Sequence, residues 1–389
     1  MLTRIGLNHN LQIFVVTIFT NLLARYTWYA LLPLHLRALG ASDLEIGYTF
    51  TAMTLARNIF SFVGGTLADR YGRRILIALS TIVMGPFYAL GGFGRDWFAV
   101  AAALVCAEIC GAFQWPPISA LITESSEKDR VARSFSFTES AMMLGLIGGP
   151  VLGAALLKFC DIQNLMLATG GTLVVTGILR GVALREAPRK KSGTGLPDLR
   201  AALDANVAWF TVANVCLIVS FAIVFGPYFA ILARDAWHNT DAEINLLWAA
   251  GSIAALGGVF AGRLSDHWGG KHVLGIGALG FGIGTMVWGI APTWEWGIAP
   301  LLVAFFFSEM AIIAQQTLQA DITTPATRSS VIGAIATVTG LFGGAGPTFG
   351  AWLITIGGNP LPFLAAGALG LLILPAIAPL QKISASHSS

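Results

Sequence analysis

Five ionisable side chains stand within long apolar runs of the 389-residue sequence. They are two arginines and three glutamates: Arg25, Arg57, Glu108, Glu139 and Glu309. A guanidinium group only donates hydrogen bonds, whereas a carboxylate accepts them and can take up or release a proton. A charge at the centre of a bilayer costs at least ~2.5–3.5 kcal/mol on insertion scales, so charges retained there predict a function. The chemistry that these residues favour is solute binding and proton movement.

Two of the glutamates are expected to differ in their surroundings. Glu108 lies near the depth of Arg25 and Arg57, which predicts an ion pair with either arginine. Such a pair could be purely structural, because buried charges must be paired in any case. No Lys, Arg or His occurs within a predicted span of the second half, so we expect Glu309 to be protonated when dry and ionised when wetted, as proton coupling requires. The alternative is a glutamate that stays protonated and hydrogen-bonds a neighbouring helix.

The composition places these charges in a membrane. Hydrophobic residues make up 55% of the chain and charged residues 11%, against roughly 25% charged residues in soluble domains. A soluble fold of this size needs far more charge to cover its surface. The four cysteines have no spacing typical of a disulfide or zinc site, and no nucleotide-binding P-loop occurs. We therefore expect no metal, no cofactor and no direct use of ATP.

Twelve apolar runs are long enough to cross a bilayer, since ~20 helical residues span its ~30 Å core. A charged, Pro- and Gly-containing linker at 185–207 separates a bundle at 1–184 from a bundle at 208–389. The first run has no cleavage signal behind it, so we interpret it as a helix and not as a signal peptide. The predicted spans are 11–33, 44–66, 75–94, 97–118, 134–157, 165–184, 208–232, 242–262, 273–292, 297–318, 329–355 and 361–379.

The distribution of basic residues predicts the orientation. With both termini in the cytoplasm, 17 of the 23 Lys and Arg residues fall on the inner side, Arg180 among them, and four on the outer side. Such a bias is typical of cytoplasmic loops. We expect a multi-pass protein of a bacterial or archaeal cytoplasmic membrane with both termini inside.

The chain contains an internal repeat. The segment GGTLADRYGRR at 64–74 recurs as AGRLSDHWGGK at 261–271, a shift of 197 residues. The same shift carries Pro150 and Gly153 onto Pro347 and Gly350. Because the shift is about half the chain, the sequence predicts two homologous six-helix halves in parallel orientation.

The loop between the second and third spans resembles the signature loop of the major facilitator superfamily, and its degenerate copy at 261–271 strengthens the match. The resemblance implies an all-α membrane fold of twelve helices in two pseudo-symmetric bundles. It also implies that Asp69 docks on the N-terminal end of the span at 329–355 and latches the inner gate. Alternatively, the arginines of the loop only face anionic lipid. The gating candidates here are Gly65, Asp69, Arg70, Gly72, Arg73, Arg74 and Asp266.

A second segment, at 145–154, is similar to a motif of the family's proton-antiporting exporters. Its glycines, with Gly149 and Pro150 at the centre, are expected to form a smooth face between the halves. Simple repeat symmetry is a competing explanation, since the second half has its own Gly-Pro. An arginine that many family exporters carry in the fourth span is absent. Arg57 and Glu139 fall on spans facing the opposite half, where a gating role is expected.

The resemblance implies that the first, fourth, seventh and tenth spans line a central cavity. Polar and aromatic residues recur at helical spacing on each of them. The substrate- or ion-binding candidates are Asn21, Arg25, Trp28, Glu108, Trp115, Asn214, Phe221, Phe225, Glu309 and Gln316.

These features together predict a secondary transporter that works by alternating access. The favoured function is proton-coupled export of a small amphipathic or aromatic solute by a monomer in contact with membrane lipid, with no nucleic-acid partner. Uptake or facilitated diffusion of a small metabolite is the nearest alternative. A membrane-embedded enzyme is a remote one, since it would need a nucleophile–base or metal constellation at one depth.

Overall fold

The structure, a computed structural model, describes residues 8–126, 130–186, 204–323 and 328–380. These residues form helices and turns, and no strand occurs among them. By their contacts they divide into two compact units: residues 1–192 with 240–249, here the N-terminal unit, and residues 193–239 with 250–389, the C-terminal unit. Most of the linker predicted at 185–207 lies outside the described residues.

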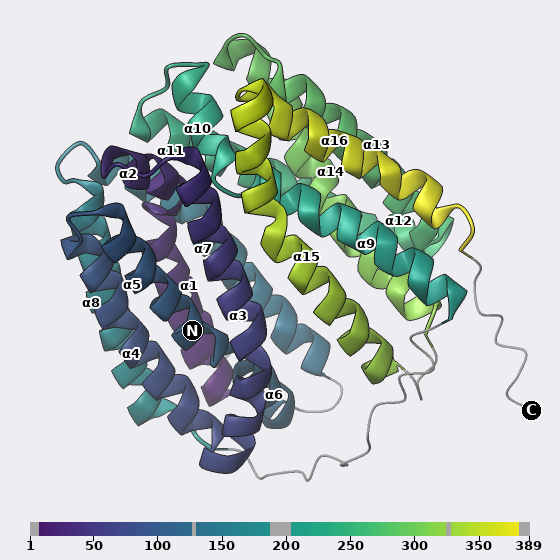
Figure 1. The fold of residues 1–389 in the computed structure, drawn as a ribbon. Coiled ribbons are helices and arrows are strands. Elements are labelled where there is room, and N and C mark those ends of the chain that lie inside the picture. Colours follow the sequence, from purple (N-terminus) through teal and green to yellow (C-terminus); the bar gives the residue numbers. More distant parts are fainter. Residues whose placement is uncertain (1–7, 127–129, 187–203, 324–327, 381–389) are drawn as a thin grey trace, which may run out of the picture. The chain divides into compact units, whose positions relative to one another are not determined.

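The N-terminal unit holds the helices of the first half. In it α4 and α8 lie side by side, as do α1 and α7 (Figure 1). The helices are α1 (His9–Tyr26), η2 (Tyr29–Leu31), α2 (Leu32–Ala38), α3 (Asp43–Tyr71), α4 (Arg73–Phe93), α5 (Trp97–Ala112), α6 (Trp115–Ser125), α7 (Val131–Leu156) and α8 (Ile162–Ala183).

The C-terminal unit repeats this pattern of packing, with α13 against α14 and α16, and α9 against α15 and α16. The first part of α11 groups with the N-terminal unit. The helices of the second half are α9 (Ala205–Val224), α10 (Tyr228–Asp235), α11 (Asp241–Ala255), η5 (Leu256–Phe260), α12 (Ala261–Trp268), α13 (Gly270–Gly289), α14 (Trp294–Asp321), α15 (Arg328–Gly357) and α16 (Pro360–Ile377).

Three spans predicted as single helices are broken. The chain leaves helical geometry after Tyr26, Ala112 and Val224, and each time a short helix follows. Proline favours the restart, because it lacks an N–H and its fixed φ suits the first turn of a helix. Pro lies at the start of α2 and of α6, and Pro227 caps α10. A fourth span, predicted at 242–262, is likewise divided among α11, η5 and α12.

The loop repeat has the same backbone geometry in both units. Gly72, between α3 and α4, has a φ of +99°, and Gly269, between α12 and α13, has a φ of +81°. A residue with a Cβ is strained at such a φ, so glycine is the residue that adopts this turn without strain. The shared geometry supports the repeat.

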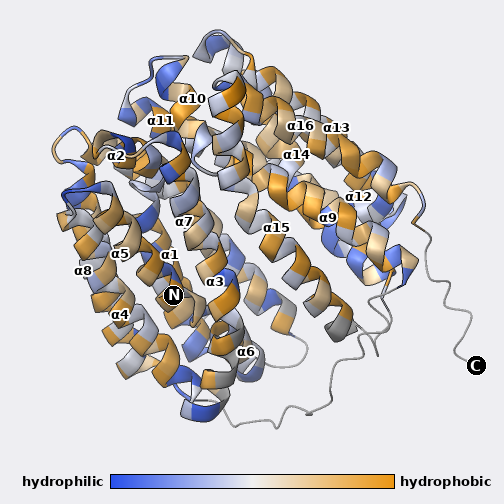
Figure 2. Cartoon of the chain, in the orientation of Figure 1, coloured by the Kyte–Doolittle hydropathy of each residue, from blue (hydrophilic) through white to orange (hydrophobic). Residues whose placement is uncertain are grey.

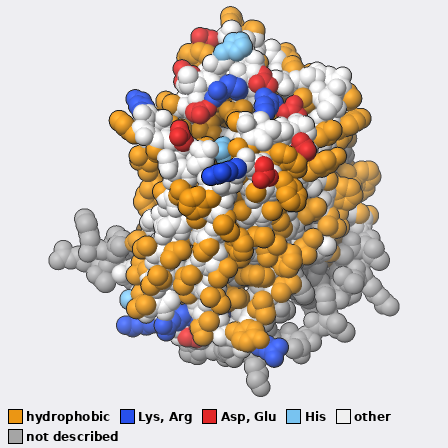
Figure 3. Space-filling view, turned by 60° about the vertical axis from the view of Figure 1, so that its left-hand side comes forward, with side chains coloured by type: hydrophobic (Ala, Val, Ile, Leu, Met, Phe, Trp, Pro, Cys, Tyr) orange, Lys and Arg blue, Asp and Glu red, His pale blue; other side chains and the backbone are white. Residues whose placement is uncertain are grey.

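The surface is that of a protein embedded in a bilayer. Ten segments among the described residues are long and apolar enough to cross a membrane, and α1 and α3 are two further long helices. Large apolar side chains face outward, such as Phe98 and Val182, which are 67% and 77% exposed. Apolar residues dominate the long helices (Figure 2), and the face in Figure 3 has an apolar middle with charged side chains gathered above and below.

Candidate functional site

A cavity of about 410 Å³ lies inside the N-terminal unit. It is within the size range of small-molecule sites. Four charged side chains face it, and the rest of the wall is apolar or neutral. The lining residues are Ile18, Asn21, Leu22, Arg25, Arg57, Asn58, Ser61, Met84, Tyr88, Glu108, Gly111, Ala112, Gln114, Trp115, Ile118, Met142, Leu173 and Arg180.

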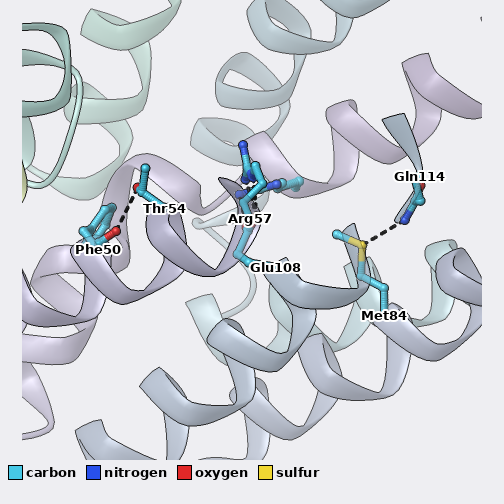
Figure 4. A network of polar contacts seen from close by, with 7 residues as sticks. Phe50, Thr54, Arg57, Met84, Glu108 and Gln114 are labelled. Carbon is cyan, nitrogen blue, oxygen red and sulfur yellow. Dashed lines mark hydrogen bonds and ion pairs between the residues drawn. The ribbon is translucent and has the colours of Figure 1, made fainter. Parts of the chain in front are cut away.

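Glu108 bridges two arginines at one end of the cavity. Its Oε1 accepts a hydrogen bond of 2.6 Å from Arg25 Nη2, and its Oε2 accepts one of 2.7 Å from Arg57 Nε and another from Arg57 Nη2. Figure 4 shows the side chain of Arg57, on α3, directed at Glu108, on α5. The Glu108 side chain is 2% exposed, that of Arg25 14% and that of Arg57 50%. The predicted ion pair is therefore a triad, in which one carboxylate binds both arginines.

Aromatic rings hold Arg25 in place. Its guanidinium lies 4.7 Å from the ring centroid of Tyr29 and 5.9 Å from that of Tyr88. Cation–π contacts of this length stabilise a desolvated guanidinium. Arg25 Nε and the hydroxyl of the buried Tyr88 have no hydrogen-bond partner among the described residues. Two donors at this end of the cavity are therefore available to a ligand.

A third arginine, Arg180, stands at the other end of the cavity. It comes from α8, is 1% exposed, and has only neutral oxygens as partners among the described residues. Nε donates to Thr17 Oγ1 at 2.9 Å, and Nη1 donates to Thr81 Oγ1 at 2.9 Å and to Gln114 Oε1 at 3.0 Å. Gln114 is oriented in turn by its contact with Met84 Sδ (Figure 4).

The position of Arg180 corrects the sequence analysis, which counted it among the basic residues of the inner side. The buried face of α8 runs through Thr169, Leu173, Thr176 and Arg180, at helical spacing. That face packs on α1 and α4, so the arginine enters the bundle and not the loop. The threonines on the same face were the available signal.

Trp28 does not line the cavity. The predicted stripe needed one continuous helix through Asn21, Arg25 and Trp28, but α1 ends at Tyr26. The indole is fully buried, and its Nε1 donates to Thr169 Oγ1 at 2.9 Å. Trp28 therefore packs the bundle, whereas the other two residues of the stripe face the cavity.

The remaining candidates of the first half divide in the same way. Trp115 lines the cavity and is 43% exposed. Asn21 lines it as well, and its Oδ1 accepts a bond of 2.7 Å from Thr176. Glu139 lies on the exposed side of α7 and away from the cavity wall.

In the C-terminal unit two of the candidates, Phe221 and Phe225, belong to an aromatic cluster. The ring of Phe221 is 5.5 Å from that of Phe225 and 4.9 Å from that of Phe281, and Phe225 is 4.6 Å from Phe305. Asn214 is buried about two turns earlier on α9, with no partner for its Oδ1 among the described residues. Glu309 is half-buried on α14, and Gln316 is exposed near the end of that helix.

The signature loop is tied to the N-terminal unit. Backbone N–H groups of Arg73 and Arg74 donate to the Glu186 carboxylate at 2.8 and 3.0 Å, and Arg74 Nε donates to the Gly181 carbonyl at 2.8 Å. Arg73 also pairs with Glu124. A carboxylate at a helix N-terminus accepts hydrogen bonds from the N–H groups that lack a partner within the helix, and it interacts favourably with the positive end of the helix dipole. Two of the arginines thus fasten α4 to α6 and α8.

The other gating candidates are less constrained. Arg70 is exposed over the ring of Tyr71, and Asp266 is exposed on α12. The structure does not describe the side chain of Asp69, the surroundings of Gly65 or the side chains of residues 328–330, at the start of the helix proposed to receive Asp69. The inner latch stays a prediction.

The glycine motif packs within one unit. A Cβ on Gly149 would lie 2.6 Å from Tyr26 Cβ and 2.9 Å from the Leu23 carbonyl, both on α1. The buried Pro150 follows it on the same helix. Gly149 thus packs on α1, whereas a Cβ on Gly153 would also lie 2.7 Å from Nδ2 of Asn245 on α11, a helix of the second half of the sequence. The predicted role of the motif between the halves stays a prediction. A Cβ on the equivalent Gly346 of α15 would lie 2.7 Å from Ala222 Cβ on α9, so repeat symmetry accounts for this packing without reference to export.

The fold and the charged cavity between its helices are those of a membrane transport protein. The family model described as Major Facilitator Superfamily matches residues 14–236 and 212–383, and the chain belongs to that superfamily.

Relatives of known name are distant. Quinolone resistance protein NorA of Staphylococcus aureus is 24% identical over 250 residues, which cover 63% of this chain and 64% of the relative. The Multi-drug resistance efflux pump PmrA homolog of Lactococcus lactis is 24% identical over 264 residues, with the same coverage. The match thus spans less than two thirds of these relatives.

Solved structures share the whole fold. That of the nucleoside transporter NupG aligns with a TM-score of 0.81 at 14% identity, covering 96% of this chain and all of the other. A bacterial homolog of the human lysosomal transporter Spinster aligns with a TM-score of 0.76 at 16% identity, covering 95% and 94%. At such identities the likeness is one of fold alone.

Proposed function

We propose that this transporter exports a small amphipathic or aromatic solute in exchange for protons. The observation that carries the proposal is the cavity of the N-terminal unit, where charged groups stand among Met, Leu, Ile and Trp side chains. Such a wall suits a solute with an apolar body and a few polar atoms. The two named relatives, a quinolone resistance protein and a multidrug efflux pump, favour export over uptake. The proposal includes a monomer with both termini in the cytoplasm.

Glu309 is the proposed coupling acid. Ala112, which stands 197 residues earlier at the equivalent position of the repeat, lines the cavity of the N-terminal unit. Glu309 thus occupies the corresponding place on α14, half-buried, about one helical turn after Phe305 of the aromatic cluster. A carboxylate that alternates between a dry and a wetted state binds and releases a proton with conformation.

The test is transport by the purified protein in proteoliposomes, with a fluorescent quinolone as the probe. A pH gradient should drive accumulation by the wild type. Glu309→Gln, which mimics the protonated acid, should abolish the response to the gradient and leave probe exchange at equal concentrations intact. The matched control is Glu295→Gln on the exposed first turn of the same helix.

Two results would refute the proposal. If Glu309→Gln still concentrates the probe in response to the gradient, Glu309 is not the coupling acid. If the wild type accumulates the probe only when the gradient has the opposite sign, the protein is an uptake symporter.

A further inference from the structure

The cavity of the N-terminal unit has an excess of positive charge. Three guanidinium groups, those of Arg25, Arg57 and Arg180, line it together with one carboxylate, that of Glu108. Glu108 is already bound to two of the arginines at the first end of the cavity. Two positive charges are left without a counter-ion among the described lining residues.

Arg180 is the arginine to which no carboxylate is bound. Among the described residues its partners are the oxygens of Thr17, Thr81 and Gln114, all neutral. A buried charge is costly unless it is paired, and neutral hydrogen bonds offset only part of that cost. Arginine cannot lower the cost by losing its proton. The site is therefore incomplete without an anion.

The two charged ends are separated by an apolar stretch. Arg180 binds Thr17 on α1, and Arg25 lies eight residues further along the same helix, about 12 Å at 1.5 Å per residue. Between them the wall is formed by side chains such as Ile18, Leu22 and Met84. Two unpartnered polar groups stand at the far end: Arg25 Nε, which only donates, and the Tyr88 hydroxyl, which can donate or accept. A ligand that fits must offer acceptors and an apolar body.

We propose that this cavity binds an amphipathic organic anion, whose carboxylate or other acidic group is held by Arg180. The inference names the substrate class and rests on the proposed function only in taking this cavity as the substrate site. A planar carboxylate can accept two parallel hydrogen bonds from a guanidinium, and such pairs are strong in a dry site.

The test measures binding to the purified full chain in detergent, without any gradient. The probes are dansylglycine and its methyl ester, which share the aromatic body and differ in the anionic group. The wild type should bind the acid at least tenfold more tightly than the ester at neutral pH. Arg180→Gln should remove this preference, whereas Arg180→Lys should retain part of it.

Gln114→Glu keeps Arg180, so this variant tests the site without requiring the protein to fold in the absence of the arginine. It keeps the side-chain shape and places a carboxylate on Arg180, from which Gln114 Oε1 already accepts a bond. The variant should fold as well as the wild type, and its affinity for the acid should fall at least tenfold relative to its affinity for the ester. Gln163→Glu, on the first turn of α8 and outside the cavity wall, adds the same charge as a control.

The outcomes separate the two proposals. Equal wild-type affinity for acid and ester, or a folded Gln114→Glu protein that binds the acid as the wild type does, would overturn the anion site. Equal losses for both probes in Arg180→Gln would assign Arg180 a structural role and overturn it too. If binding follows the expected pattern but no gradient drives transport, the anion site stands and proton-coupled export fails.

Discussion

Removing the Glu108 carboxylate is the most informative perturbation of the triad. In Glu108→Gln both arginines lose their counter-ion at once, in a site where the glutamate side chain is only 2% exposed. Breaking a buried ion pair by removing one partner costs ~3–5 kcal/mol, because the other charge is left uncompensated. We expect a loss of that size in the free energy of unfolding.

The two arginines should differ, because their burial differs. Arg25→Gln removes a partner that is 14% exposed, and about 2–3 kcal/mol is expected because Glu108 keeps its bonds to Arg57. The Arg57 side chain is 50% exposed, so Arg57→Gln should cost about 1 kcal/mol or less. The expected order of loss is Glu108, Arg25, Arg57. A simple pair would predict equal losses for its two members.

The assay is reversible unfolding in mixed detergent micelles, applied to the three single variants and to the Arg25→Gln/Glu108→Gln double variant. Residues in direct contact show coupling of about 0.5–3 kcal/mol in a double-mutant cycle. The double variant should therefore be more stable than the sum of the single losses predicts. Additive losses, or an Arg57 variant as damaged as the glutamate variant, would refute the geometry described for the triad.

Three further outcomes can be measured by the same unfolding assay. Gly72→Ala places a side chain at a φ of +99° and should destabilise the protein by about 1 kcal/mol or more, whereas Gly171→Ala, where the added Cβ meets nothing within 4 Å, should be near neutral. Gly149→Val should separate α1 from α7 and cost about 1–3 kcal/mol, since even a Cβ would lie 2.6 Å from Tyr26. Burial lowers the pKa of the His35 imidazole, on α2, below its ordinary value of 6.5, so the unfolded chain binds a proton more readily than the folded one. The stability that depends on His35 should be full above pH 6.5 and should fall as the pH drops through and below that value. His35→Gln should flatten this dependence.

The sequence predicts the fold well because the constraints on it are local and repeated. A run of ~20 apolar residues specifies a membrane helix irrespective of the rest of the chain. The loop repeat specifies two equivalent halves, and Gly72 and Gly269 indeed have nearly the same backbone angles. The ion pair at Glu108 could also be predicted from the sequence, because a buried carboxylate requires a cation at its depth.

The rest of the site could not be predicted, because it depends on the residue at which each helix ends and on which helix face is directed into the bundle. The stripe through Trp28 fails because α1 stops at Tyr26, and the apolar run continues through that break without any change in character. Arg180 was misassigned because it lies one turn from a predicted helix end, where an arginine is ordinarily a cytoplasmic charge. The packing of α8 on α1 and α4 shows that this arginine points inward.

The charged residues of the cavity have no charged equivalents at the corresponding positions of the second half. A shift of 197 residues carries Arg25, Arg57, Glu108 and Arg180 onto Ala222, Ala254, Phe305 and Ile377, all of them apolar. Phe305 belongs to the aromatic cluster of the C-terminal unit, and Ile377 to its hydrophobic core. In the reverse direction Glu309 corresponds to Ala112. If these charges were needed to stabilise the fold, the second half would need equivalents, yet the same helical framework packs there without them. This asymmetry favours the proposal that the polar residues of the first half bind a solute and that Glu309 on α14 acts together with them.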